Sequence, residues 1–345
     1  MTDGETLLSV EDLRVHFAAE NGDLPAVAGV SFGIRPGSVL ALVGESGCGK
    51  SVTGYSILRL IQPPGRIVGG RIVLHSRRLG PVDITGLSDA DDRLYRVRGG
   101  LVSLVFQEPM SALSPVHRLG DQVTEAIRLH QTTTPTEARR RGIDLLRRVG
   151  VPAPDRLFEQ YPHEVSGGMR QRVVIAMALG GNPELLIADE PTTALDVTTQ
   201  AQILGLIKAH QRDAGCAVLL ITHDFGVVAQ MADEVAVMYL GRIVEQGRVD
   251  DILRHPRHPY TQGLLHSLPS LTRSGRLAAI PGVVPSLAAI PPGCAFHPRC
   301  PHAQPGRCDG GKPPPLGRLE PGHEAACHRL EEIPAWNPAA VEPAR

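Results

Sequence analysis

A glycine-rich segment, Gly44-Glu45-Ser46-Gly47-Cys48-Gly49-Lys50-Ser51, has the residue types and spacing of a phosphate-binding loop. Its glycines allow backbone N–H groups to face phosphate oxygens, and a helix expected over 52–61 adds positive potential at its N-terminus. Lys50 is then expected to reach the β- and γ-phosphates, and the Ser51 hydroxyl to ligate Mg²⁺. The apolar run 39–43 just before the loop predicts a buried strand, which is the context that such a loop requires.

A second chemical motif is the apolar run 185–188, which is followed by Asp189 and Glu190. A buried strand that ends in two carboxylates places Asp189 to hold Mg²⁺ and Glu190 to polarise an attacking water. A solvated acidic turn would explain this motif if it stood alone. Together with the phosphate-binding loop, it predicts a nucleoside triphosphatase.

The elements that must position these motifs are predicted by short apolar runs that alternate with helical patterns. This alternation indicates an α/β fold with a largely parallel sheet, and the run 217–222 predicts a third buried strand. A helix is expected to begin near Thr134, because Pro135 suits its first position and Glu137 can complete a capping box. The arginines of this helix, at 139–141 and 147–148, are expected to form a solvated face.

The composition excludes several classes of protein. The chain has 345 residues, 42% of them hydrophobic, which is enough for two or three compact units. Its net charge of −1 argues against nucleic-acid binding through bulk charge. The longest strongly apolar stretch, 216–221, is too short to span a membrane, and the acidic start at 1–5 lacks the features of a signal peptide. We expect a cytosolic chain that reaches a membrane only through a partner.

Further motifs resemble the ATP-binding cassette family, the ATPase subunits of ABC transporters. The segment Ser166-Gly167-Gly168-Met169-Arg170-Gln171 is similar to the family signature, with Val165 and Met169 in place of the commonest Leu and Gln. Ala194-Leu195-Asp196 resembles the D-loop. The resemblance implies a head-to-tail pair of cassettes, in which the signature of one chain completes the ATP site of the other.

Three single residues are assigned through the same resemblance. Gln107 resembles the Q-loop glutamine that senses Mg²⁺ and faces the membrane partner, and His223 resembles the switch histidine that contacts the γ-phosphate. Phe17 lies where the family has an aromatic residue that stacks on adenine. Each has another explanation, because a single Gln is often a surface residue, a His at a strand end is often structural, and Phe17 could belong to the core.

The resemblance covers about residues 7–255 and implies a P-loop NTPase of the RecA-like α/β type. It implies a helical subdomain at about 109–165 that transmits motion to membrane subunits. The nucleotide-binding residues that it implies are Phe17, Gly44, Glu45, Ser46, Gly47, Cys48, Gly49, Lys50, Ser51, Val52, Gln107, Ser166, Gly167, Gly168, Asp189 and Asp196. The catalytic residues that it implies are Gln107, Glu190 and His223, and the Mg²⁺ ligands are Ser51, Gln107 and Asp189.

The C-terminal part differs in composition, since residues 281–345 hold 14 of the 30 prolines. Its four cysteines, Cys294, Cys300, Cys308 and Cys327, could bind a metal that staples a loop-rich extension. The segments 255–265 and 292–300 resemble the oligopeptide, dipeptide and nickel importer branch, some members of which carry a 4Fe–4S cluster on such cysteines. Zn²⁺ is the alternative, although paired C-x2-C spacing is absent, and free thiols are the third possibility. The histidines of this part are expected at the surface, and Cys216 in the core.

The expected organisation is an ABC ATPase domain over 1–270 and a small extension with four cysteines over 271–345. The expected function is to energise the import of peptides or related small solutes. The expected partners are a second ATPase subunit, two membrane permease subunits and an extracytoplasmic solute-binding protein, at the cytoplasmic face of the membrane. The second ATPase subunit is expected to be a paralogue, with a copy of this chain as the alternative. The alternative is a cassette ATPase of a cytosolic complex that acts on nucleic acid, ribosomes or phosphonates.

Overall fold

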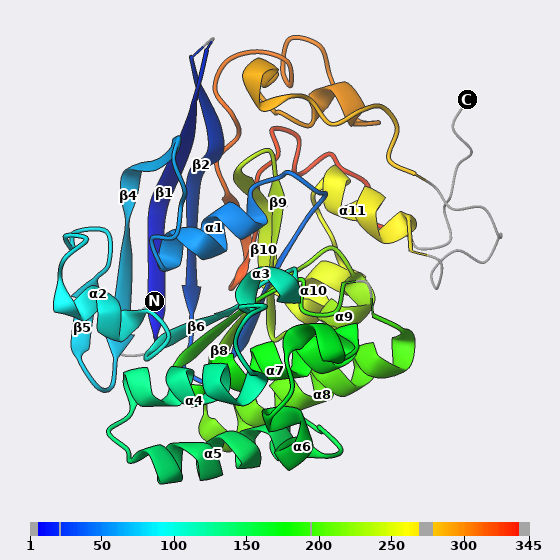
Figure 1. Ribbon diagram of the computed structural model, residues 1–345. Coiled ribbons are helices and arrows are strands. Elements are labelled where there is room, and N and C mark those ends of the chain that lie inside the picture. The colour runs from blue at the N-terminus through cyan, green and yellow to red at the C-terminus, as the bar shows by residue number, and fades with distance from the viewer. Residues whose placement is uncertain (1–5, 21, 194, 269–278, 338–345) are drawn as a thin grey trace. The chain divides into compact units, whose positions relative to one another are not determined.

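The computed structural model describes residues 6–20, 22–193, 195–268 and 279–337 (Figure 1). The strands are β1 (Leu8–Ala19), β2 (Gly22–Ile34), β3 (Val39–Val43), β4 (Gly65–Ser76), β5 (Gly80–Asp83), β6 (Val102–Val105), β7 (Leu185–Asp189), β8 (Ala217–Thr222), β9 (Glu234–Tyr239), β10 (Arg242–Arg248), β11 (Gly317–Glu320) and β12 (His323–Ala325). The α-helices are α1 (Lys50–Ile57), α2 (Asp92–Val97), α3 (Pro109–Ala112), α4 (Leu119–His130), α5 (Pro135–Arg148), α6 (Pro154–Phe158), α7 (Gly167–Gly180), α8 (Val197–Ala214), α9 (Phe225–Met231), α10 (Val249–Arg254) and α11 (Pro259–His266). The short 3₁₀ helices are η1 (Pro162–Glu164), η2 (Leu287–Ala289) and η3 (His297–Arg299).

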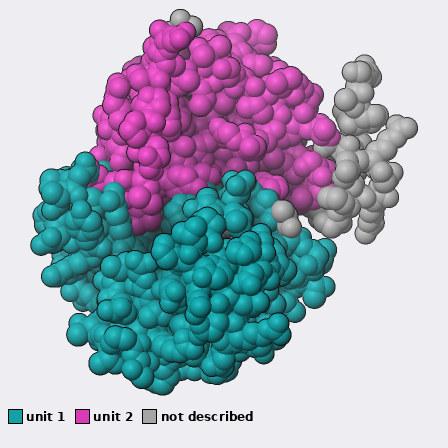
Figure 2. Space-filling model, viewed as in Figure 1, with its two compact units in different colours: residues 1–9, 33–39, 73–221 teal, residues 10–32, 40–72, 222–345 magenta. Residues whose placement is uncertain are grey.

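The chain forms two compact units, coloured separately in Figure 2. Unit 1 comprises residues 1–9, 33–39 and 73–221, and unit 2 comprises residues 10–32, 40–72 and 222–345. The predicted strand 39–43 is confirmed as β3. In the described part of the chain, no helix is long and apolar enough to cross a membrane.

Unit 1 contains a parallel arrangement of β6, β7 and β8, in which Val102 pairs with Leu185 and Leu185 pairs with Ala217. Every residue of β7 and β8 is buried, because apolar side chains face both sides of the sheet. The strands predicted over 185–188 and 217–222 are thereby confirmed. Helices α4, α5 and α7 pack against one another in the same unit (Figure 1).

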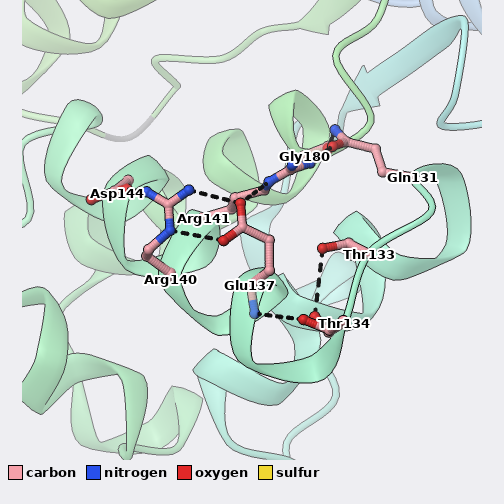
Figure 3. A network of polar contacts seen from close by, with 8 residues as sticks. All are labelled: Gln131, Thr133, Thr134, Glu137, Arg140, Arg141, Asp144 and Gly180. Atoms are coloured by element: carbon pink, nitrogen blue, oxygen red, sulfur yellow. Dashed lines mark hydrogen bonds and ion pairs between the residues drawn. The ribbon is translucent and has the colours of Figure 1, made fainter.

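Helix α5 begins where the sequence predicts it (Figure 3). The Thr134 hydroxyl accepts a hydrogen bond from the Glu137 N–H at 3.3 Å, and Pro135 occupies the first turn. The Glu137 carboxylate accepts hydrogen bonds from Arg140 at 2.8 and 2.7 Å and from Arg141 at 2.8 Å. These ion pairs occupy both of its oxygens, so the second half of the predicted capping box is replaced by contacts within the helix.

Unit 2 contains β3 beside β9 in parallel, and β9, β10, β12 and β11 continue in antiparallel order. The C-terminal strands β11 and β12 thus extend the sheet on which the phosphate-binding loop is built. An aromatic cluster lies beside β9: the ring centroid of Tyr239 is 4.7 Å from that of Tyr260 and 5.3 Å from that of Phe296. The described part of the extension therefore shares a core with unit 2.

Candidate functional site

The phosphate-binding loop in unit 2 leads from β3 into α1 (Lys50–Ile57). Compared with the expected helix over 52–61, α1 begins two residues earlier and ends four residues earlier. Gly44, Gly47 and Gly49 have φ angles of 153°, 78° and 105°, which favour glycine. A Cβ on Gly44 would lie 2.3 Å from the Met238 carbonyl oxygen, and one on Gly49 would lie 2.4 Å from that of Ala26. The loop therefore needs glycine at both positions for steric reasons as well as conformational ones.

Lys50 is buried at the start of α1, and its Nζ donates to the carbonyl oxygens of Gly44 at 2.8 Å and Glu45 at 3.0 Å. These bonds hold the ammonium group inside the loop that carries it. Cys48 is also buried, and burial raises the pKa of its thiol, which agrees with a small residue that packs in the loop. Ser46, Ser51 and Val52 are exposed or half-buried at this part of unit 2.

Unit 1 contains the acidic motif. Asp189 is fully buried at the end of β7, and Glu190 follows it with a φ of 45°, an unusual conformation for a residue other than glycine. Glu190 Oε2 accepts hydrogen bonds from Gln107 Nε2 at 3.2 Å and from the Thr193 hydroxyl at 2.8 Å. The structure thus brings together Gln107 and Glu190, two residues that the sequence predicts from separate motifs. Thr193 is a third member of this group that the sequence analysis missed.

The segment that resembles the signature caps a helix in the same unit. Ser166 is the N-cap of α7, and its hydroxyl accepts from the Met169 N–H at 3.4 Å. Ser166 and Gly167 are exposed, and Gly168 is half-buried. Further along α7, buried Gln171 donates from Nε2 to the carbonyl oxygen of Pro191 at 2.9 Å. This hydrogen bond therefore connects α7 directly to the segment that follows Glu190.

The remaining predicted residues lie as follows. Asp196 is the exposed N-cap of α8 and accepts from the Thr199 N–H at 3.0 Å, whereas Ala194 of the same motif lies outside the described residues. His223 follows β8 directly and is exposed. Phe17 is half-buried on β1, and a Cβ on Gly65 would lie 2.6 Å from its ring, so the ring contacts the start of β4.

The four C-terminal cysteines are also brought together in unit 2. Cys294, Cys300, Cys308 and Cys327 line one small cavity, with histidines at 258, 297, 302 and 328 also on its wall. Burial raises the pKa of Cys294 to about 11 and that of Cys300 to about 12, so both thiols are neutral at pH 7. Among the described residues, no three His, Cys, Asp or Glu side chains are arranged to hold a metal ion.

Two smaller expectations have different outcomes. Cys216 is buried, as expected for a core residue.

The expectation that the C-terminal histidines lie at the surface is wrong for His323. That residue is buried, and its Nε2 lies 2.8 Å from Oε1 of the fully buried Glu245. Pairing with a buried carboxylate allows a polar ring inside the core.

Two residues that no chemical motif indicates, Tyr260 and Arg299, also contact the phosphate-binding loop. Arg299 forms an ion pair with Glu45, with Nη1–Oε2 at 2.6 Å, and the Glu45 N–H donates to the Tyr260 hydroxyl at 2.9 Å. Tyr260 lies in the segment 255–265 and Arg299 lies in the segment 292–300. Only the family resemblance distinguishes these two segments in the sequence. No local pattern indicates a contact between residues 299 and 45, which are 254 positions apart.

Comparisons with known proteins agree with this geometry. The family model described as "ABC transporter" matches residues 27–193, and the model described as "Oligopeptide/dipeptide transporter, C-terminal region" matches residues 244–308. The chain is similar to the probable peptide ABC transporter ATP-binding protein y4tR of Sinorhizobium fredii, at 48% identity over 95% of this chain and 96% of the relative. It is also similar to the oligopeptide transport ATP-binding protein OppD of Bacillus subtilis, at 48% identity over 92% of this chain and 87% of the relative.

A solved structure supports the same assignment of fold. The dimeric post-hydrolysis state of the ATP-binding cassette MJ0796, bound to ADP and Pi, matches with a TM-score of 0.62 and 25% identity, over 70% of this chain and 98% of that one. The predicted ABC ATPase fold is confirmed by this likeness. Because relatives that are nearly half identical match along almost its whole length, the chain belongs to the ABC transporter ATP-binding proteins of the oligopeptide and dipeptide importer type, and it is an ATPase cassette.

Proposed function

We propose that this chain drives the uptake of peptides or related small solutes by hydrolysing ATP beneath partner membrane subunits. One observation carries the proposal: relatives that match along more than nine-tenths of the chain are named as peptide transport or import ATP-binding proteins. The loop from Gly44 to Ser51, with its three glycines at positive φ, supports the ATP-binding part of the proposal.

In the proposed site, the loop from Gly44 to Ser51 binds the phosphates through backbone N–H groups, with Lys50 donating to the β- and γ-phosphates. When bound, Mg²⁺ neutralises phosphate charge, and Ser51, Gln107 and Asp189 would hold it. Glu190 accepts a proton from the attacking water, and its contacts with Gln107 and Thr193 fix the carboxylate for that task. His223 contacts the γ-phosphate, and Phe17 stacks on the base.

The second part of the proposal is a pair of cassettes, with the partner cassette being a paralogue. Each ATP would lie between the phosphate-binding loop of one chain and the signature segment of the other. The exposure of Ser166 and Gly167 at the N-terminus of α7 supports this role, because a helix N-terminus with free access can receive an anion. Asp196, also exposed, would lie at the same junction.

The third part concerns the membrane subunits and the extracytoplasmic binding protein. The helical subdomain that we propose, at about 109–165, follows Gln107 and exposes apolar side chains. Val116 is 74% exposed and Leu129 is 70% exposed, and Met110 is exposed as well. Such side chains are suited to contact a partner. We propose that they dock the membrane subunits, which would hold the chain at the cytoplasmic face of the membrane.

The fourth part is a 4Fe–4S cluster on Cys294, Cys300, Cys308 and Cys327, with Zn²⁺ as the alternative. The shared cavity supports this, because all four cysteines line it within a proline-rich segment. The four cysteines would bind such a centre as thiolates, and the centre would favour the loss of their thiol protons. Anaerobic purification with analysis of iron, sulfide and zinc tests it. About four irons and four sulfides per chain are expected; stoichiometric zinc without sulfide would select the alternative, and neither metal would refute both.

The transport proposal is tested by purifying the whole complex and inserting it into vesicles. The expected result is ATP-dependent accumulation of labelled peptides that stops when Lys50→Ala replaces the native chain. The proposal would be contradicted if no labelled peptide accumulated and if peptides and the binding protein left the rate of ATP hydrolysis unchanged. That result would favour a cassette ATPase of another kind.

A further inference from the structure

Glu45 is the second residue of the phosphate-binding loop, and its carboxylate, its N–H and its carbonyl oxygen all form hydrogen bonds within unit 2. Its carboxylate accepts two hydrogen bonds from Arg299, at 2.6 and 2.9 Å. Its N–H donates to the Tyr260 hydroxyl at 2.9 Å, and its carbonyl oxygen accepts from Lys50 Nζ at 3.0 Å. The loop conformation and the position of the Lys50 ammonium group thus depend on the same residue.

The Arg299 side chain is fixed from several directions. It is only 4% exposed, against 26% for Glu45, and its Nε donates to the Pro281 carbonyl oxygen at 3.1 Å. Its guanidinium carbon lies 5.9 Å from the ring centroids of both Tyr239 and Phe296. A buried guanidinium that forms a two-bond contact with a carboxylate is costly to separate from it. Arg299 therefore cannot move without disturbing Glu45.

The backbone of Arg299 belongs to the segment with the four cysteines. It lies in η3, the turn between Cys294 and Cys300, where the His297 N–H donates to the Cys294 carbonyl oxygen at 2.9 Å and the Cys300 N–H donates to the His297 carbonyl oxygen at 3.3 Å. The Cys294 N–H also donates to the Cys308 carbonyl oxygen at 2.9 Å. The turn between two cysteines of the cavity thus also sets the position of Arg299.

We propose that Arg299 is a positioning residue of the nucleotide site: through Glu45 it fixes the phosphate-binding loop, and it couples ATP binding to the order of the four-cysteine segment. The inference rests on the proposed binding of ATP at this loop. Coupling between two sites is reciprocal, so ATP must stabilise the four-cysteine segment by the same free energy that this segment contributes to ATP affinity.

The first test measures the dissociation constant of Mg-ATP for the full chain by calorimetry. Arg299→Lys keeps the charge but loses the two-bond contact, so the dissociation constant should rise at least about fivefold, the lower end of ordinary coupling between sites. Arg307→Lys is the matched control, because Arg307 pairs with Glu332 in the same segment and is 46% exposed. The control should bind ATP like the native chain.

The second test separates coupling from a general loss of structure. Hydrogen exchange of the peptide 293–309 is followed with and without Mg-ATP, and the native chain and the control should exchange more slowly with ATP. Arg299→Lys should lose this ATP-dependent slowing. If that variant does not fold, Glu45→Gln provides the same comparison from the other side of the ion pair.

The outcomes are distinct. A native chain that does not bind ATP, or that binds it as tightly as Lys50→Ala, would refute the proposed site itself. If the native chain binds ATP more tightly than Lys50→Ala, an unchanged dissociation constant in Arg299→Lys would overturn the inference. The inference would also be overturned if Mg-ATP slowed the hydrogen exchange of the peptide 293–309 as much in Arg299→Lys as in the native chain.

Discussion

Glu190 stands at the end of a buried strand with its carboxylate held by two neighbours. Gln107 and Thr193 donate to the same oxygen, Oε2, at 3.2 and 2.8 Å. Both neighbours are uncharged donors, and their hydrogen bonds restrict the position of the carboxylate, as a residue that accepts a proton from water requires. This arrangement suits a residue that orients a water molecule.

Glu190→Gln should therefore bind ATP normally but lose most of its turnover. The loss expected for a general base is about 100-fold or more. Hydrolysis and nucleotide retention are measured in the complex with the partner cassette silenced, and the variant should also trap a closed pair. Glu159→Gln, at an exposed position, is the control and should keep its turnover. Near-normal hydrolysis by Glu190→Gln would refute the assignment.

Lys50→Ala, unlike Glu190→Gln, should weaken the binding of ATP, because it removes the ammonium group from the phosphate-binding loop. Its affinity for ATP should fall about tenfold or more, as expected for lost hydrogen bonds to a charged group. Fluorescence titration with an ATP analogue measures the affinity directly. Unchanged affinity would show that the nucleotide binds elsewhere.

His210 in α8 provides a test of stability at the scale of one residue. It is buried without a hydrogen-bond partner for either ring nitrogen in the described structure, and burial together with the positive charge of Arg148 lowers its pKa. On acidification, the unfolded chain therefore binds a proton before the folded chain does. The stabilisation present above the ordinary pKa of about 6.5 is lost as the pH falls below it.

The fall in melting temperature between pH 7.5 and pH 5.5 should accordingly be smaller in His210→Leu than in the native chain. His163→Gln, at an exposed position, is the control and should leave the fall unchanged. Equal falls in His210→Leu and the native chain would show that His210 is not the group responsible.

Helix α5 shows how far an element can be predicted from local residues. Thr134, Pro135 and Glu137 indicate where the helix begins, and the structure confirms that start. The predicted solvated face is also confirmed for the arginines at 139, 140, 147 and 148, which are exposed. Arg141 is half-buried because it contacts Gln131 as well as Glu137 (Figure 3). Contacts within one helix are local, so sequence alone predicts most of them.

Thr134→Ala should destabilise the protein by about 1 kcal/mol, the usual cost of removing an N-cap hydroxyl. Urea unfolding of the native and variant chains measures this difference. The neighbouring Thr133→Ala removes only a long hydrogen bond, of 3.5 Å, and should cost less than about 0.5 kcal/mol. Equal effects of the two substitutions would show that the cap does not stabilise α5.

The strands divide into those that the sequence predicts and those that it cannot. β3, β7 and β8 are continuous apolar runs, which are typical of strands buried on both faces. β11 and β12 contain charged residues in the sequences Gly-Arg-Leu-Glu and His-Glu-Ala, and no apolar run marks them. Their strand conformation depends on pairing with one another and with β10, which is distant in sequence.

At the scale of the whole molecule, the residues of the candidate site could be named from sequence, but the contact between Arg299 and Glu45 could not. Motifs report residues that bind a common ligand, because their types and spacing follow its chemistry. A single ion pair between positions 254 apart has no such local pattern. The four cysteines are a case between these two. Their number and their place in a proline-rich segment predict a shared site, but only the fold shows that all four line one cavity.

The pair of cassettes gives a prediction at the same scale. Ser166→Arg should place a bulky side chain at the N-terminus of α7 and disrupt hydrolysis at the partner's phosphate-binding loop. ATP binding at this chain's own loop should remain intact, as measured on the isolated chain. If the complex with Ser166→Arg hydrolyses ATP at the native rate, and the isolated chain alone does so too, the shared site is refuted.

The most direct test of the central claim is the uptake of a labelled peptide into vesicles that contain the purified complex, with ATP supplied at the side of this chain. We predict uptake against a gradient that requires ATP and the solute-binding protein, and that falls to background when Glu190→Gln replaces the native chain. Peptide accumulation at the native rate with Glu190→Gln in place and the partner cassette silenced would contradict the claim that this chain energises the transport.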